Sequence, residues 1–179
     1  MSPNEVASIA NTEILEPSIP LFFPVSLRKL LVLLICTLGG YSIYWFYKNW
    51  QLVKSREHSS ISPKDRAVFW FIFYYPLFCR LKKSAAEIGI GTFPAGTLIV
   101  CFIITSWLSQ SDPFGCWWFT ILGIFSLLIF QHIANRINAV IAPNHDRNTQ
   151  FTFWNIVAVV LGGGLLALLT VSEFQMLNH

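Results

Sequence analysis

Residues 30–47, LLVLLICTLGGYSIYWFY, decide the fold class, because eighteen consecutive residues carry no charge. A helix rises about 1.5 Å per residue, so a helix of this length measures about 27 Å, close to the hydrocarbon thickness of a bilayer. Arg28 and Lys29 precede the stretch and Lys48 follows it. A charged side chain in mid-membrane costs about 3 kcal/mol. The stretch therefore predicts a membrane-spanning helix.

Three further apolar stretches predict an all-α, polytopic membrane protein with four spans. The stretch 67–79 is apolar but contains Pro76 and is too short to cross a bilayer comfortably. It predicts a short re-entrant or interfacial segment. The four predicted spans are 30–47, 95–110, 114–130 and 153–171.

Residues 27–179 are expected to form a single transmembrane domain that follows a disordered tail. The tail, residues 1–26, has no basic residue and contains four prolines, a composition that does not favour a packed core. Beyond the first span, Ser62-Pro63 predicts the start of a helix. Serine caps the backbone N–H groups at a helix N-terminus, and proline suits the first helical turn.

The composition excludes several classes of protein. The chain is 54% hydrophobic and 12% charged, whereas soluble domains are about 25% charged. The net charge of +3 is spread over several loops, so the concentrated basic face of a nucleic-acid-binding protein is missing. The four cysteines have no paired spacing, which indicates free thiols rather than disulfides or metal ligands. No cofactor is expected.

The basic residues predict the orientation, because cytoplasmic loops are enriched in Lys and Arg. If 67–79 does not cross the membrane, loops 48–66, 80–94 and 131–152 lie on one side and hold ten Lys and Arg. If 67–79 does cross, the best division is seven inside against five outside. The four-span arrangement is therefore favoured, with both termini outside the cytoplasm.

Small and aromatic residues predict two kinds of contact in the membrane. Small residues let helices approach closely in lipid, and aromatic rings with a polar atom favour the headgroup level. A ligand-binding aromatic cluster is the alternative for the second group. The predicted packing positions are Gly39, Gly40, Gly162, Gly163 and Ala167. The predicted interfacial anchors are Tyr44, Trp45, Tyr47 and Trp50.

The predicted spans contain no acidic residue, basic residue or histidine. Membrane enzymes and ion-coupled transporters keep such residues in their spans because the chemistry requires them. The sequence therefore predicts a protein that is not an enzyme.

A polar cluster on the predicted cytoplasmic side is the best candidate site. Carboxamides and arginine can bind a phosphate or a protein loop, so the cluster is a candidate for lipid headgroups or a partner. Helix capping and turn formation are the alternative. A metal site is disfavoured, because His132 and His145 are separated by Pro143 and Asp146 is the only nearby carboxylate. The candidate residues are Asn135, Asn138, Asn144, His145 and Arg147.

Three stretches together resemble a known group of proteins: TLGGYSIYWFYKNW at 37–50, RAVFWFIFYYPLF at 66–78 and ANRINAVIAPNHDRNTQFTFWNI at 134–156. They are similar to small bacterial multi-pass membrane proteins of a domain-of-unknown-function family. That family is marked by a Gly-Tyr-x-x-Tyr-Trp-Phe-Tyr-Lys end to its first span. The resemblance implies a location in the bacterial inner membrane and transfers no catalytic residue.

Together these observations predict a non-enzymatic structural or partner-binding membrane component. Its expected partners are membrane lipids and either another protein or a second copy of the chain, which would pack against its glycine faces. The alternative is a small transporter or lipid-handling protein that uses 67–79 and the Asn-rich loop. Nucleic acid is not an expected partner.

Overall fold

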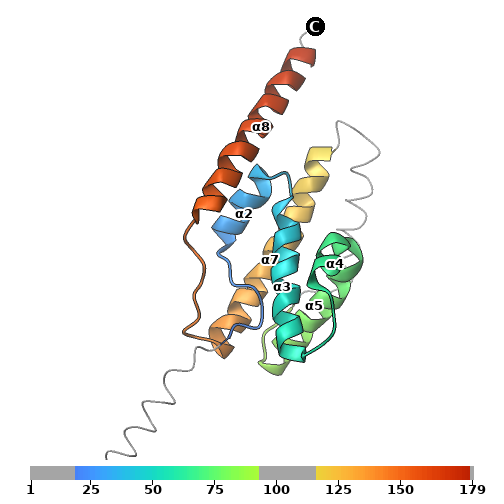
Figure 1. Cartoon of the computed structure of the whole chain (residues 1–179), viewed down its shortest axis with the longest axis vertical. Helices are drawn as coiled ribbons and strands as arrows, with labels where there is room; N and C mark the ends of the chain where they lie inside the picture. The colour runs from blue at the N-terminus through green and yellow to red at the C-terminus, as the bar shows by residue number, and fades with distance from the viewer. Residues whose placement is uncertain (1–18, 93–115, 178–179) are drawn as a thin grey trace, which may run out of the picture.

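The computed structural model describes residues 19–92 and 116–177, and these ranges contain helices and no β-strand. The predicted all-α class is therefore confirmed, while the predicted span 95–110 lies outside the described residues. In chain order the helices are α2 Leu27–Cys36, α3 Tyr41–Glu57, α4 Pro63–Val68, α5 Trp70–Glu87, α7 Cys116–Ile141 and α8 Phe153–Leu177 (Figure 1).

The first predicted span is a helical hairpin rather than one straight helix. Helix α2 ends at Cys36, and α3 runs back in the opposite direction from Tyr41 (Figure 1). Between them Leu38 has a φ of 50° and Gly39 a φ of 83°. This left-handed conformation costs glycine little and ends a helix. The expectation of a continuous helix over 30–47 is corrected accordingly.

The turn of this hairpin satisfies its own backbone groups. The Thr37 hydroxyl donates to the carbonyl of Leu33 at 2.6 Å and accepts from the backbone N–H of Tyr41 at 2.9 Å. A Cβ built on Gly39 would meet nothing within 4 Å, and one on Gly40 would meet the carbonyl of Thr37, within the same turn. The two glycines therefore form a turn and are not the helix-packing surface that the sequence predicted.

Helix α4 begins at the predicted start, and a separate helix, α5, follows it after a break at Phe69. The hydroxyl of Ser62 accepts from the backbone N–H of Asp65 at 3.4 Å, and Pro63 opens α4. The chain leaves the helix at Phe69, whereas Pro76 lies inside α5. The helix therefore continues through Pro76, which the sequence singled out, and breaks at Phe69 instead.

An aromatic core forms where α3, α5 and α7 meet. The side chains of Trp45, Phe46, Tyr74 and Phe130 are almost fully buried. The rings of Trp45 and Phe130 are 5.0 Å apart at 84°, and those of Phe46 and Tyr74 are 5.7 Å apart at 78°. These edge-to-face arrangements add to the stabilisation that comes from burial. The core packs α7 against α3 and α5.

Two of the predicted interfacial anchors belong to this core instead. Trp45 and Trp50 are 0% exposed, because they lie on the face of α3 that packs against the rest of the chain. Tyr44 lies on the opposite face and is 46% exposed, and Tyr47 is half-buried. An anchor must reach the headgroups, so the assignment of Trp45 and Trp50 as anchors is corrected.

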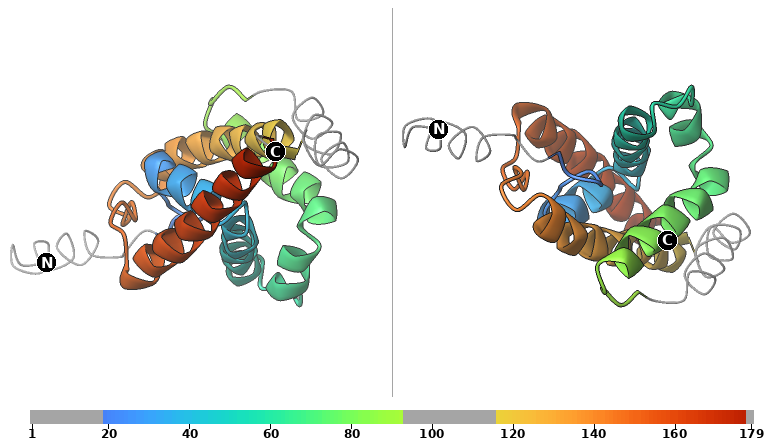
Figure 2. Two further views of the ribbon diagram at one scale, coloured as in Figure 1. Left: turned by 90° about the horizontal axis from the view of Figure 1, so that it is seen from above. Right: turned by 90° about the horizontal axis from the view of Figure 1, so that it is seen from below.

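The N-terminal tail becomes ordered well before residue 26. Residues 21–26, which we call the strap, run between α3 and α7, as the view from below in Figure 2 shows. Phe22 and Val25 of the strap are 0% exposed. Burial of these apolar side chains orders the segment, so the predicted disordered tail does not extend to residue 26.

Two helices are long and apolar enough to cross a membrane by length and composition: Gly123–Ile141 within α7 and Phe153–Ser172 within α8. About half of the first segment is buried inside the protein, whereas the second buries none of its residues. These two segments overlap the predicted spans 114–130 and 153–171. Neither a third nor a fourth span is found within 19–92 and 116–177.

Helix α8 packs against α2 through its glycines. A Cβ on Gly162 would lie 1.9 Å from the carbonyl oxygen of Cys36, and one on Gly163 would lie 3.9 Å from the Cys36 sulfur. Only glycine at position 162 permits this approach. Ala167 is exposed. The small-residue face that the sequence singled out is thus occupied in part by another helix of the same chain.

Candidate functional site

Polar side chains of α7 bind the strap. The carboxamide of Asn138 donates to the carbonyl of Phe22 at 2.8 Å and accepts from its N–H at 3.1 Å. Asn135 donates to the carbonyl of Val25 at 2.9 Å. The strap has no neighbouring strand, so these side chains satisfy backbone groups that burial would otherwise leave unpaired.

A second set of carboxamides ties the strap to α3. Asn49 accepts from the backbone N–H of Phe23 at 3.1 Å and donates to the carbonyl of Trp45 at 3.0 Å. Gln131 donates to the carbonyl of Phe23 at 3.0 Å and accepts from the indole N–H of Trp45 at 2.6 Å. The strap is thereby held from both sides, and its path is fixed by hydrogen bonds as well as by burial.

Lys29 fixes the start of α2. It is 2% exposed, and its ammonium donates to Asn148 Oδ1 at 2.7 Å and to the carbonyl of Gln150 at 2.6 Å. Burial lowers the pKa of Lys29, while the charge of Asp146 acts in the opposite direction. Both hydrogen-bond partners lie in the loop 142–152, so Lys29 ties α2 to the connection between α7 and α8.

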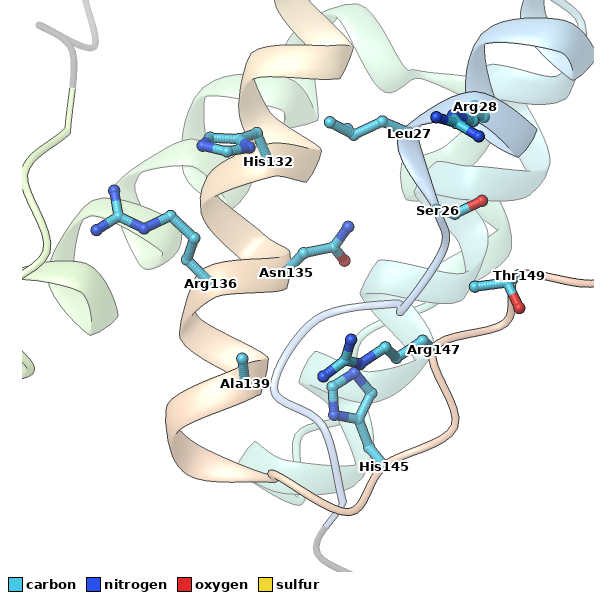
Figure 3. A pocket seen from close by; sticks show the side chains of 10 residues that line it. All are labelled: Ser26, Leu27, Arg28, His132, Asn135, Arg136, Ala139, His145, Arg147 and Thr149. Carbon is cyan, nitrogen blue, oxygen red and sulfur yellow. The ribbon is translucent and has the colours of Figure 1, made fainter.

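A cleft of about 530 Å³ opens beside the strap. Its lining contains three arginines and two histidines and no carboxylate. A lining of this kind is rich in hydrogen-bond donors and carries a positive potential, which favours an anion. The lining residues are Ser26, Leu27, Arg28, His132, Asn135, Arg136, Ala139, His145, Arg147 and Thr149 (Figure 3).

Three segments of the chain bring these residues together. His132, Arg136 and Ala139 recur at helical spacing and form one face of α7. The end of the strap and the start of α2 form a second wall, and the loop that follows α7 forms the third, as Figure 3 shows.

His145 has a fixed tautomer in this arrangement. Its Nδ1 contacts the carbonyl oxygen of Ala142. A carbonyl can only accept, so Nδ1 carries a proton. Arg147 lies beside His145 in Figure 3, and its guanidinium supplies hydrogen-bond donors to this part of the lining.

The predicted site residues are divided between this cleft and the structural core. Asn135, His145 and Arg147 line the cleft. Asn138 is 0% exposed beneath the strap, and Asn144 is exposed but is not part of the lining.

The sequence prediction missed part of the lining. It did not include His132 among the candidate contact residues and did not place Arg136 at the site. The helical spacing of the two residues was the available signal. It placed Arg28 on the other side of the membrane because it took 30–47 as one helix.

The described part of the chain contains no group of three His, Cys, Asp or Glu residues that could hold a metal ion. A further charged cluster, outside the cleft, is structural. Arg80 donates from Nε and Nη2 to the two carboxylate oxygens of Glu57, at 2.8 and 3.1 Å. The guanidinium groups of Arg66 and Arg80 lie 4.2 and 5.3 Å from the ring centre of Trp50. These contacts join α3 to α4 and α5.

No protein-family model, curated protein or solved structure matches this chain. The resemblance to bacterial membrane proteins stays a prediction.

Proposed function

We propose that this protein is a membrane-embedded, non-enzymatic binding protein that holds a phosphate-bearing anion in the cleft beside the strap. The observation that carries the proposal is the lining, which has three arginines, two histidines and no carboxylate. Phosphate oxygens accept several hydrogen bonds at once, and arginine is the side chain whose geometry suits them best. The lining offers mainly hydrogen-bond donors, and the hydroxyl of its serine, Ser26, caps α2 by accepting from the backbone N–H of Lys29 at 3.3 Å. We therefore propose binding rather than a reaction.

The position of the cleft supports a ligand at the membrane surface. It lies along the last third of α7 and beside the loop that leads to α8, and these helices contain the two candidate spans. Helix α8 begins part-way up the molecule, after the loop has run back along α7 (Figure 1). With α8 crossing a bilayer from Phe153, the loop 142–152 lies at the headgroup level. The part of the Gly123–Ile141 segment that lines the cleft then lies outside the hydrocarbon, so the cleft lies close to the level of the lipid phosphates. The ligand is therefore either an anionic lipid headgroup or a free phosphate.

The glycine surface gives less support to the partner-binding function that the sequence favoured. Gly162 is covered by α2 of the same chain. A protein partner or a second copy would have to use another surface, such as the exposed apolar side chains of α8. We therefore prefer the lipid-handling alternative for the cleft and keep the partner as a prediction.

Native mass spectrometry of the detergent-purified chain tests the proposal. The protein is incubated with phosphatidylglycerol, with phosphatidylcholine or with inorganic phosphate, and bound species are counted. We compare Arg136→Gln/Arg147→Gln with Lys82→Gln/Lys83→Gln, which removes two exposed charges away from the cleft. A hydrogen bond to a charged group contributes about 1.5–3 kcal/mol, so the cleft variant should lose at least about tenfold in affinity.

Each outcome has a distinct meaning. A loss of phosphatidylglycerol confined to the cleft variant supports a lipid headgroup, and a loss of inorganic phosphate without lipid preference supports a free anion. An equal loss in both variants means that net charge alone attracts the ligand, and the proposed site is then wrong.

A further inference from the structure

We propose that α2 and α3 form a re-entrant hairpin. It enters the bilayer from the side that carries the basic residues, reaches about half depth and returns to the same side. The N-terminus then lies on the same side of the membrane as the loop 142–152. The proposal goes beyond anion binding and does not depend on it.

The start of the hairpin is held at the membrane surface where α8 begins. The ammonium of Lys29 donates to the carbonyl of Gln150, three residues before α8 begins, at 2.6 Å. The same ammonium reaches Asn148 at 2.7 Å. When α8 crosses the membrane from residue 153, α2 must begin at the same level, on the same side.

The end of the hairpin returns to this side. Asn49 in α3 binds the backbone of Phe23, and Arg56 at the end of α3 donates to the carbonyl of Leu21 at 3.2 Å. The strap that receives these bonds is also bound by Asn138, close to the C-terminal end of α7. Both ends of the hairpin are therefore tied to the end of α7 from which the loop to α8 departs.

The tip of the hairpin reaches only part of the way across. Cys36, the last residue of α2, packs against Gly162, the tenth residue of α8. Nine helical steps correspond to about 14 Å, which is about half of a hydrocarbon layer about 30 Å thick. Helix α2 has 10 residues, and a helix of that length, about 15 Å, does not cross a bilayer.

The surface and backbone of the hairpin suit lipid. Irregular backbone at membrane depth must have its polar groups satisfied within the protein. In the turn the N–H of Gly39 donates to the carbonyl of Leu34 at 2.7 Å and that of Gly40 to the carbonyl of Thr37 at 2.9 Å. The outward side chains are apolar and 36–46% exposed, and they comprise Leu31, Val32, Ile35, Leu38, Ile43 and Tyr44.

The distribution of charge identifies lipid as the occupant of this surface. The chain has 12 Lys and Arg, and none of them lies in 30–47 or in α8. If 30–47 crossed the membrane, Arg28 and Lys29 would lie on the opposite side from the other ten. With a re-entrant hairpin and no crossing by α4 or α5, all 12 share one side, as the enrichment of cytoplasmic loops in basic residues requires.

Cysteine accessibility in cells that express the full chain tests this topology. In a background with the four native cysteines replaced by serine, three single variants are compared: Ser8→Cys, Leu38→Cys and Ser60→Cys. We expect a membrane-impermeant maleimide to label positions 8 and 60 only after the cells are permeabilised. Position 38, at the hairpin tip, should stay unlabelled until the protein is denatured.

Two results would overturn the proposal. Labelling of position 8 in intact cells while position 60 stays protected would mean that α2–α3 crosses the bilayer. Labelling of position 38 as fast as position 60 after permeabilisation would mean that the hairpin lies in water. If the cysteine-free background does not fold, protease digestion of an N-terminal epitope on the otherwise native chain replaces it. The epitope should be cleaved in inside-out vesicles and protected in right-side-out vesicles, and the reverse pattern contradicts the proposal.

Discussion

Single carboxamide side chains form hydrogen bonds with the backbone of the strap, as a neighbouring strand does in a sheet. Asn138 makes two hydrogen bonds to one residue of the strap, and Gln131 connects the strap to an indole of α3. The two bonds of Asn138 and the bond between Gln131 and the indole are buried, and an unpaired buried donor or acceptor costs about 1–3 kcal/mol. The polar face of α7 is therefore satisfied mainly within the chain. Arg136, on the neighbouring face of α7, is left to the cleft, and Asn135 both binds the strap and lines the cleft.

The ion pair between Glu57 and Arg80 predicts a pH effect at the same scale. The hydrogen bond from Arg80 holds the pKa of Glu57 below its usual range. The pair therefore contributes stability above the pKa of an unfolded glutamate, about 4.3. That contribution is lost as the pH falls through the lower pKa of the folded state.

Both side chains of this pair are about one-third exposed, so the contribution should be only about 0.2–1 kcal/mol. The melting temperature of Glu57→Gln in detergent should lie slightly below that of the parent at pH 7, and the difference should shrink as the pH falls through the lowered pKa of folded Glu57. A difference that stays constant down to the most acidic pH at which the protein is folded would show that the ion pair is not its cause.

At the scale of elements, the sequence identifies helices reliably and their bends poorly. The apolar stretch 30–47 has the same hydropathy as a straight span and as a hairpin. The glycine pair at 39–40 is compatible with both, because glycine serves helix contacts in lipid as well as left-handed turns. The bend depends on Lys29 and on the strap, which fix where α2 begins. Those contacts are distant in sequence, and no local pattern contains them.

The contact between α2 and α8 gives a prediction at this scale. Substitution Gly162→Ala places a Cβ against the backbone carbonyl of Cys36, which would lie 1.9 Å away without movement. A backbone atom cannot turn aside as a side chain can, so α8 must shift, and we expect a loss of about 1–3 kcal/mol. Gly164→Ala is the matched control, because nothing lies within 4 Å of its Cβ. Thermal unfolding in detergent measures both, and equal melting temperatures would contradict the observed packing.

At the scale of the whole molecule, the cleft and the topology depend on the same few long-range contacts. The sequence singled out Asn135, His145 and Arg147 as part of a polar cluster, and all three line the cleft. It could not combine them with Arg28, because counting spans placed that residue on the far side. The mismatch of Arg28 and Lys29 in the charge count was the one signal available. The side on which these two residues lie can be assigned only when the path of the strap is known. Hydrogen bonds within the protein set that path, and hydropathy does not reveal it.

The strap should therefore control both stability and the cleft. Asn138→Ala removes the two partners of the Phe22 backbone, and each group left unpaired costs about 1–3 kcal/mol. We expect a lower melting temperature together with weaker anion retention, because the last residue of the strap, Ser26, and the first two residues of α2 form one wall of the cleft. Asn144→Ala, at an exposed position of the loop, is the matched control and should change neither. A variant at Asn138 that loses stability but retains the anion unchanged would show that the cleft wall does not depend on the strap.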